Sequence, residues 1–147
     1  MIPLTDEDSV NPGDTYADGI WTPAPPPPAP DPKEAKLAEL NAACNAEILA
    51  GFTSSALGTP HDYDFDYEAQ INLGGTLNAI TAGIIASNDL IQWKTVDAGI
   101  LDHTVDQFKT LFVHGMAHKQ TNISKYWTLK AQVLAATTQA EIDAIVW

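Results

Sequence analysis

Acidic and aromatic residues alternate without a break between residues 62 and 68. The aromatic members are Tyr63, Phe65 and Tyr67, and the acidic members are Asp62, Asp64, Asp66 and Glu68. Successive side chains of a strand point to opposite faces, so the alternation predicts an extended strand with an acidic face and an aromatic face. Burying such a ring is favourable by roughly 1.5–3 kcal/mol. We therefore expect the aromatic face to lie against a core or a partner.

A helix and a turn precede this strand. Asp31 is a suitable N-cap and Pro32 suits the first helical position, while Gly51 supplies a stop, which predicts a helix over about residues 32–50. Its apolar stripe comprises Leu37, Leu40, Cys44 and Ile48. Cys44 is therefore expected to be a core residue. The short apolar-polar run from Phe52 to Leu57, a turn at residues 58–60 and the alternating strand together predict a β-hairpin.

The pattern then becomes helical from about residues 68–70 to Ile84. The predicted apolar stripe comprises Leu73, Leu77, Ile80 and Ile84. Gly74 and Gly75 each weaken such a helix by roughly 1 kcal/mol. Their presence in this helix predicts that it packs closely against another element there.

A second hairpin and two more helices are predicted downstream. The hairpin covers residues 90–103 and turns at residues 97–99. Thr104-x-x-Gln107 is a capping box that opens a long helix running to about Ala135, and Thr138 begins a similar signature before a last short helix. The predicted buried stripe of the long helix includes Val105, Phe108, Leu111, Phe112, Met116, Ile123, Trp127 and Leu134. We expect the last residue, Trp147, to be docked against the body or a partner.

The predicted fold is mainly α with two short β-hairpins, an α+β domain over residues 33–147 behind an arm at residues 1–32. The arm holds nine of the 10 prolines, six acids and no basic residue, so it is predicted to be extended, with polyproline II character. Two interpretations remain open. The arm is either a disordered tail or a segment that becomes ordered on a partner, with Ile20 and Trp21 as its anchor.

The charge excludes several classes of function. The formal net charge is −12, with 19 acids against 7 basic residues, all of them lysine. Nucleic-acid binding needs a basic face, and an acidic surface disfavours anionic membranes.

No segment resembles a signal peptide or approaches the roughly 18 apolar residues of a membrane span. The single cysteine, Cys44, cannot form an internal disulfide. We expect a soluble, cytosolic protein.

No pattern predicts catalysis, a metal site or a cofactor. The run Asp62-x-Asp64-x-Asp66 begins like a calcium loop but lacks the glycine and the bidentate glutamate that such a loop needs. His114 and His118 share a helix face without an evident third ligand. Carboxylates on a solvent-facing strand have no apolar pocket to raise their pKa. We therefore predict that the chain is not an enzyme.

One longer pattern joins the first helix to the alternating strand: Glu47-Ile48-x-x-Gly51-Phe52-x-Ser54-Ser55-x-Leu57-Gly58-x-x-His61-x-Tyr63, then Asp66-x-x-x-Gln70-x-Asn72-Leu73. This pattern resembles a helical domain of unassigned function in bacteriophage tail proteins, including tail-fibre assembly proteins. The Trp93 hairpin, His118, Lys130 and the step at residues 135–138 fit as well, so the resemblance covers roughly residues 35–147. It implies a non-enzymatic tail part or a chaperone for trimeric tail fibres.

Two functional hypotheses follow from the residues and the resemblance. The first is a tail-fibre assembly chaperone that acts in the host cytoplasm, assists trimerisation of the fibre and then either leaves or stays on the virion. The second is a permanent structural component of the tail, fibre or baseplate. The expected partner is the trimeric fibre chain, with a homo-oligomer as a further expectation. The candidate contact residues are Ile20, Trp21, Tyr63, Phe65, Tyr67 and Trp147.

Overall fold

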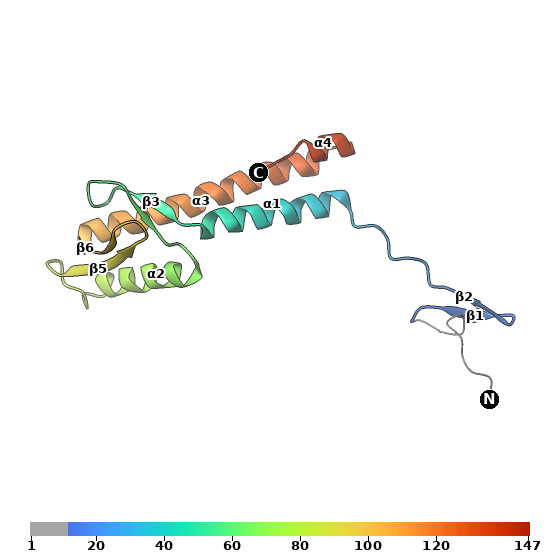
Figure 1. Ribbon diagram of the computed structural model, residues 1–147, viewed down its shortest axis with the longest axis horizontal. Helices are drawn as coiled ribbons and strands as arrows, with labels where there is room; N and C mark the ends of the chain where they lie inside the picture. Colours follow the sequence, from blue (N-terminus) through green and yellow to red (C-terminus); the bar gives the residue numbers. More distant parts are fainter. Residues whose placement is uncertain (1–11) are drawn as a thin grey trace, which may run out of the picture. The chain divides into compact units, whose positions relative to one another are not determined.

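In a computed structural model that describes residues 12–147, the chain divides into two compact units between Pro30 and Asp31 (Figure 1). The predicted α+β fold is confirmed, because helices dominate and the described strands form short antiparallel pairs. The first eleven residues of the predicted arm lie outside the described part.

The first unit contains a hairpin that we did not predict. Strand β1 (Thr15–Ala17) pairs with β2 (Ile20–Thr22) across the two-residue turn Asp18–Gly19. Both turn residues have positive φ, 56° and 79°, as a type I′ turn requires. The prediction of a wholly extended arm was therefore wrong at this point. Asp-Gly between two short β-prone runs was the overlooked signal.

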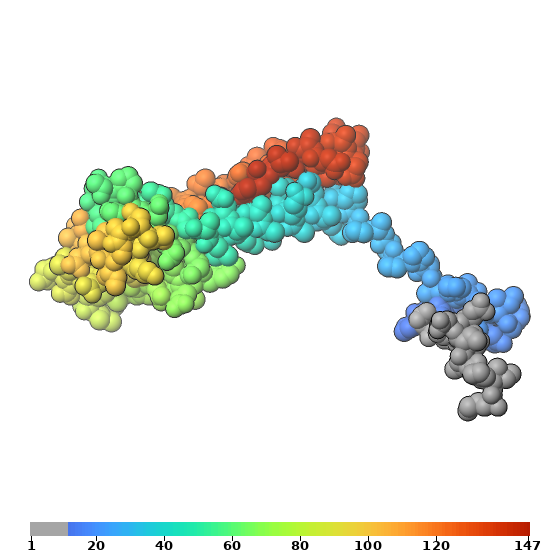
Figure 2. All heavy atoms as spheres, in the orientation of Figure 1, coloured from blue at the N-terminus to red at the C-terminus, as the bar shows by residue number. Residues whose placement is uncertain are grey.

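In the second unit, two antiparallel helices lie side by side: α1 (Pro32–Leu49) and α3 (Val105–Ala135) (Figure 1). Their predicted starts are confirmed. The Asp31 carboxylate accepts a hydrogen bond from the Lys33 amide, and the Thr104–Gln107 capping box is complete. The short helix α4 (Gln139–Asp143) begins with a second capping box and packs on α1. In the space-filling view, α1 lies against α4 and the second half of α3 (Figure 2).

The remaining elements gather around the first half of α3. They are β3 (Phe52–Ser54), β4 (His61–Tyr63), α2 (Tyr67–Thr81), β5 (Leu90–Thr95) and β6 (Gly99–Thr104). Both predicted hairpins are present, with Phe52 opposite Tyr63 in the first and Leu90 opposite Thr104 in the second. They are joined by a backbone hydrogen bond of 2.7 Å from the Val96 N–H to the Asp62 carbonyl oxygen.

The alternating stretch is a strand only in its first part. Strand β4 ends at Tyr63, and the Asp66 carboxylate accepts a hydrogen bond from the Ala69 amide, which caps α2. The prediction of a strand through Glu68 was therefore wrong, because an aspartate that can cap a helix ends the extended segment. Tyr67, now in the first turn of α2, is 65% exposed.

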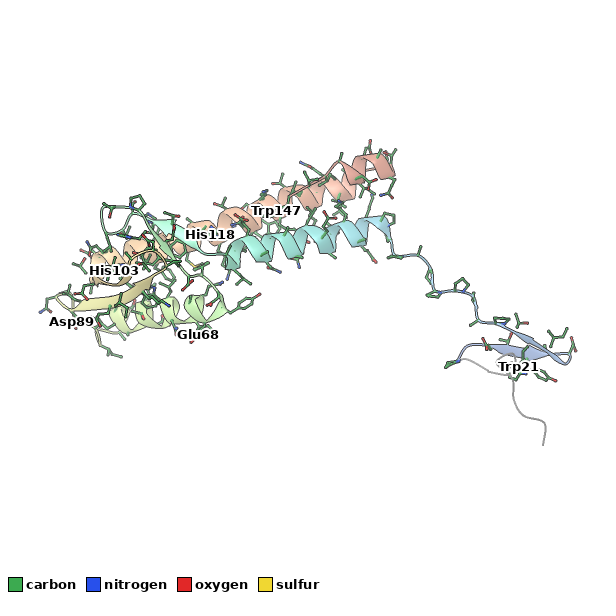
Figure 3. All side chains as sticks on the ribbon, viewed as in Figure 1. Trp21, Glu68, Asp89, His103, His118 and Trp147 are labelled. Carbon is green, nitrogen blue, oxygen red and sulfur yellow. The ribbon has the colours of Figure 1, made fainter. Side chains whose placement is uncertain are left out.

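Two hydrophobic clusters stabilise the second unit. The larger one lies beneath the hairpins and comprises Cys44, Ile48, Phe52, Tyr63, Phe65, Leu73, Ile91, Val105, Phe108 and Leu111. The smaller one joins α1, α3 and the C-terminal segment through Leu40, Val133 and Ile145. Trp147 packs against both, so it is docked on the body of this unit (Figure 3).

Three packing predictions were wrong. Met116, Trp127 and Leu134 are exposed, although they belong to the predicted buried stripe of α3. Ile84 lies beyond α2 and is exposed. Apart from the nearby backbone of α2 and the adjacent residues, no atom lies within 4 Å of where a Cβ on Gly74 or Gly75 would be, so these glycines face open space and not a close neighbour.

Candidate binding groove

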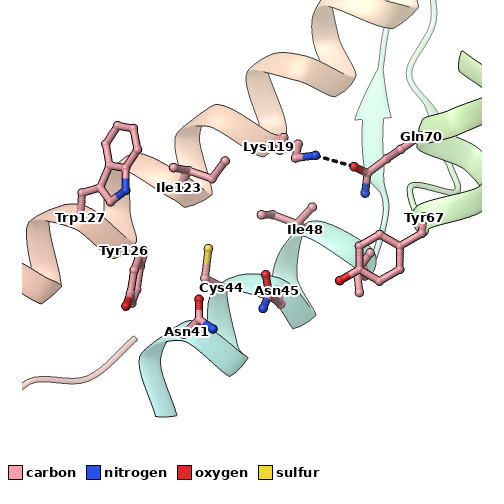
Figure 4. A pocket seen from close by; sticks show the side chains of 11 residues that line it. Asn41, Cys44, Asn45, Ile48, Tyr67, Gln70, Lys119, Ile123, Tyr126 and Trp127 are labelled. Atoms are coloured by element: carbon pink, nitrogen blue, oxygen red, sulfur yellow. Dashed lines mark hydrogen bonds between the residues drawn. The ribbon is translucent and has the colours of Figure 1, made fainter. Parts of the chain in front are cut away.

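A groove of about 340 Å³ runs between α1 and α3 and is closed at one end by the start of α2 (Figure 4). Its lining residues are Asn41, Cys44, Asn45, Ile48, Leu49, Tyr67, Gln70, Lys119, Ile123, Tyr126 and Trp127. The floor is apolar, because Cys44 and Ile48 belong to the larger core cluster. Burial raises the pKa of the Cys44 thiol, which keeps it in the less reactive protonated form.

One lysine is held in place on the wall of this groove. The Gln70 amide nitrogen donates to the Phe65 carbonyl at 2.9 Å, and its oxygen accepts from Lys119 Nζ at 2.7 Å (Figure 4). Among residues 12–147, no carboxylate lies within ion-pair distance of Lys119. An ammonium has three donors, so two remain available to an occupant of the groove.

Exposed rings and amides border the groove. Tyr67 and Trp127, 65% and 59% exposed, lie at opposite ends of it (Figure 4). Asn41 and Asn45 are one helical turn apart on α1, and both line the groove. Apolar rings beside free amide donors and acceptors are typical of surfaces that bind an extended polypeptide.

The structure separates the predicted contact residues into two groups. Tyr63 and Phe65 are only 1% and 2% exposed and pack on Phe52, so we withdraw them as partner contacts and assign them to the core. Trp147 is half-buried, with Lys125 Nζ 4.2 Å from the centre of its ring. Tyr67 is the predicted residue that lines the groove.

The predicted anchor in the first unit is exposed. Ile20 and Trp21 lie on β2 and are 66% and 53% exposed. Figure 3 labels Trp21 on this hairpin. The ring of Trp21 contacts that of Tyr16, with their centres 4.8 Å apart. The Asp14 carboxylate accepts a hydrogen bond from the Ala24 amide, which ties the hairpin to the proline-rich segment.

Each histidine has a structural partner. His118 Nε2 donates to the carbonyl oxygens of Glu47 and Ile48 in the last turn of α1, at 3.1 and 3.3 Å. His114 Nδ1 shares a hydrogen bond of 2.7 Å with the Ser54 hydroxyl. Within residues 12–147, no group of three or more His, Cys, Asp or Glu side chains is placed to hold a metal ion.

The Ser54–His114 pair resembles a nucleophile with its base, but its setting is structural. Ser54 is buried on β3, and its hydroxyl also accepts a hydrogen bond from the Ala56 amide at 3.2 Å. A nucleophile must reach a substrate atom. A buried hydroxyl that holds its own turn is therefore a connection between β3 and α3.

His103 forms the most buried polar contact of the core. Its Nδ1–H donates to the Leu101 carbonyl at 3.0 Å, so its Nε2 accepts from the Tyr63 hydroxyl at 2.8 Å. Burial lowers the pKa of His103 and raises that of Tyr63. Both shifts favour the neutral forms, which the hydrogen bonds require.

The acidic residues of the alternating stretch have separate hydrogen-bond partners, although three of them line one groove. The Asp62 carboxylate accepts from the Thr53 hydroxyl at 2.6 Å, and Asp66 caps α2. Asp64, Asp66 and Glu68 line a second, more polar groove with Trp93. Nearby, Asp97 binds His61 Nδ1 at 2.9 Å and the Asp62 amide at 3.0 Å, and these bonds lower the pKa of Asp97.

Residues 31–146 match the model of a domain family of unknown function, DUF4376. The chain belongs to this family. No curated protein and no solved structure matches the chain. None of the helices within residues 12–147 is long and apolar enough to cross a membrane.

Proposed function

We propose that this DUF4376 chain is a non-enzymatic assembly chaperone for a bacteriophage tail fibre. The observation that carries the proposal is the α1–α3 groove, because Tyr67 and Trp127 are mostly exposed beside it and its lysine, Lys119, forms no ion pair within residues 12–147. The resemblance of residues 47–73 to tail-fibre assembly proteins supplies the class of partner.

The groove supports capture of an extended segment. Tyr67 and Trp127 offer apolar faces, and Lys119 together with the two asparagine amides can bind the carbonyl oxygens of a main chain. A fibre chain that has not yet trimerised exposes strand edges and apolar side chains. In this mechanism the chaperone covers such a segment until three fibre chains pair.

The local roles of the reactive side chains favour binding over catalysis. Ser54, His114 and His118 connect β3, α1 and α3, and Asp66 caps a helix. Cys44 lies in the floor of the groove with its thiol against the Asn122 carbonyl, 3.4 Å away. These groups stabilise the scaffold that presents the groove.

Co-expression of the tail-fibre chain tests the proposal. We expect soluble, trimeric fibre when the wild-type chain is present and aggregated or monomeric fibre when it is absent or carries Trp127→Ala. Leu134→Ala is the matched control, since it removes an equally exposed side chain from α3 outside the groove. Fully soluble trimer without the chain would contradict the chaperone role.

The alternative, a permanent tail component, makes a different prediction for the virion. A permanent part is present in stoichiometric copies in purified particles, whereas a released chaperone is absent. Quantitative mass spectrometry of virions separates these outcomes. A stoichiometric copy number together with chain-independent fibre folding would favour the structural role.

A further inference from the structure

We propose that the α1–α3 groove binds the proline run 25–28 of a second copy of this chain. The inference goes beyond fibre assembly, and it shares with the proposed function the premise that the groove takes extended polypeptide. It rests on four features: the length of the groove, its donors, its charge and the stiffness of the segment that precedes α1.

The groove and the proline run have matching lengths. Along α1 the groove extends from Asn41 to Leu49, which at 1.5 Å per residue is about 12 Å. A polyproline II segment rises about 3.1 Å per residue, so about four residues fill this distance. The sequence contains one uninterrupted run of four prolines, at positions 25–28, and all four are exposed.

The chemistry of the groove also fits proline. A proline has no N–H, so a proline run can only accept hydrogen bonds through its carbonyl oxygens. The groove supplies donors from Asn41, Asn45 and Lys119, and neither asparagine amide has a hydrogen-bond partner among residues 12–147. Proline rings pack on aromatic faces, and Tyr67 and Trp127 present such faces at the two ends.

The charges are complementary. The segment before α1 carries acids and no lysine, and two of its acids, Asp18 and Asp31, flank the proline-rich stretch. Lys119 is the cation in the groove and has no acidic partner within residues 12–147. The proline run itself is uncharged, so the complementarity is between Lys119 and the acids that flank the proline-rich stretch.

A second copy is favoured over the chain's own run. To enter its own groove, the run would have to reverse direction within Pro30-Asp31-Pro32, at the start of α1. Proline fixes its own φ and disfavours the helical region for the residue before it. Asp31 accordingly has φ −57° and ψ 125°, and its carboxylate is held by the Lys33 amide. This stiff junction opposes a reversal, whereas the run of another chain has no such constraint.

Sedimentation velocity of the full chain over a range of concentrations tests the inference. We expect the wild-type sedimentation coefficient to rise with concentration. Trp127→Ala, and separately the replacement of all four prolines at positions 25–28 by serine, should each weaken self-association roughly tenfold or more. Leu134→Ala should leave it unchanged, since that side chain lies outside the groove.

Mixing the two weakened variants gives the decisive result. The Trp127→Ala chain keeps its proline run and the serine variant keeps its groove, so their mixture should regain association through one intact pairing. A wild-type chain that is monomeric at every concentration would overturn the inference, as would self-association that neither variant weakens. A mixture that stays monomeric would also overturn it.

Three further outcomes separate this inference from binding within one chain and from the proposed function. In one outcome, the chain is monomeric but the serine replacement still shifts the Trp127 indole NMR signal. The run then binds the groove of its own chain, and the proposal of a second copy is wrong. If self-association follows the expected pattern but fibre assembly does not need the chain, the proposed function fails alone. Fibre assembly that depends on Trp127 in a strictly monomeric chain overturns only the present inference.

Discussion

The two halves of α3 carry similar apolar patterns but bury them to different extents. In the first half, Phe108 and Leu111 are fully buried, because α2, β3, β5 and β6 pack against that part of the helix, whereas Val113 and Met116 remain exposed. In the second half, Trp127 and Leu134 are 59% and 57% exposed, although Val133 is buried against α1. The difference teaches that apolar periodicity marks a helix face, whereas burial depends on how many elements cover it.

The comparison predicts that the first half determines stability. Phe108→Ala removes a fully buried ring packed on Trp93, and we expect a loss of about 3–5 kcal/mol in the free energy of unfolding. Chemical denaturation of the full chain measures this loss. A cost similar to that of a surface substitution would show that this half of the helix does not form the core.

The buried polar pair is expected to have the next largest effect. Tyr63→Phe removes the hydroxyl that donates to His103 Nε2 and leaves that nitrogen buried without a partner. We expect a loss of about 1–3 kcal/mol. Tyr16→Phe is the control, since Tyr16 is exposed in the first unit. Equal stability of Tyr63→Phe and wild type would show that the pair contributes nothing to the core.

The same pair gives a dependence on pH. Because the pKa of His103 is lowered in the fold, the unfolded chain binds more protons as the pH falls below the ordinary histidine pKa of about 6.5. Stability should therefore be complete above that pH and decrease below it, toward the folded pKa. His103→Gln should reduce this slope in denaturation curves measured at successive pH values. An unchanged slope would assign the dependence to other groups.

Trp127→Ala is expected to have the smallest effect on stability. Its ring is mostly in solvent, so the free energy of unfolding should change by no more than about 0.5 kcal/mol. Differential scanning calorimetry of this variant and Phe108→Ala compares the two halves of one helix directly. A large loss for Trp127→Ala would make the groove part of the core and remove the reason to treat it as a binding surface.

Local signals predicted much of the fold. The caps at Asp31, Thr104 and Thr138 correctly gave the starts of α1, α3 and α4, because capping depends on residues next to one another in the chain. The same chemistry operates at Asp66, which caps α2. The alternating pattern continues past this residue, so it predicts a strand where the cap begins a helix. The Asp18–Gly19 turn is likewise a local signal, since both of its residues have positive φ.

The groove could not be predicted in this way. Its residues come from three helices far apart in the sequence, and Lys119 becomes distinctive only because Gln70 holds it on the wall of the groove. Of its rings, only Tyr67 is a contact candidate from the sequence, whereas Trp127 is predicted to lie in the buried stripe of the long helix. The presence of an aromatic residue in the sequence does not show whether its ring is enclosed. Tyr63 and Tyr67 are four residues apart, yet one is in the core and the other at the end of the groove.

A pull-down of the tail-fibre chain by the purified full-length protein tests most directly whether the groove binds another polypeptide. Wild type, Trp127→Ala and Leu134→Ala, shown by calorimetry to be equally stable, are compared for the amount of fibre chain that each retains. We expect wild type and Leu134→Ala to retain equal amounts, and Trp127→Ala to retain at least tenfold less, as the loss of a contact worth roughly 1.4 kcal/mol or more implies. Equal retention by all three would contradict the account.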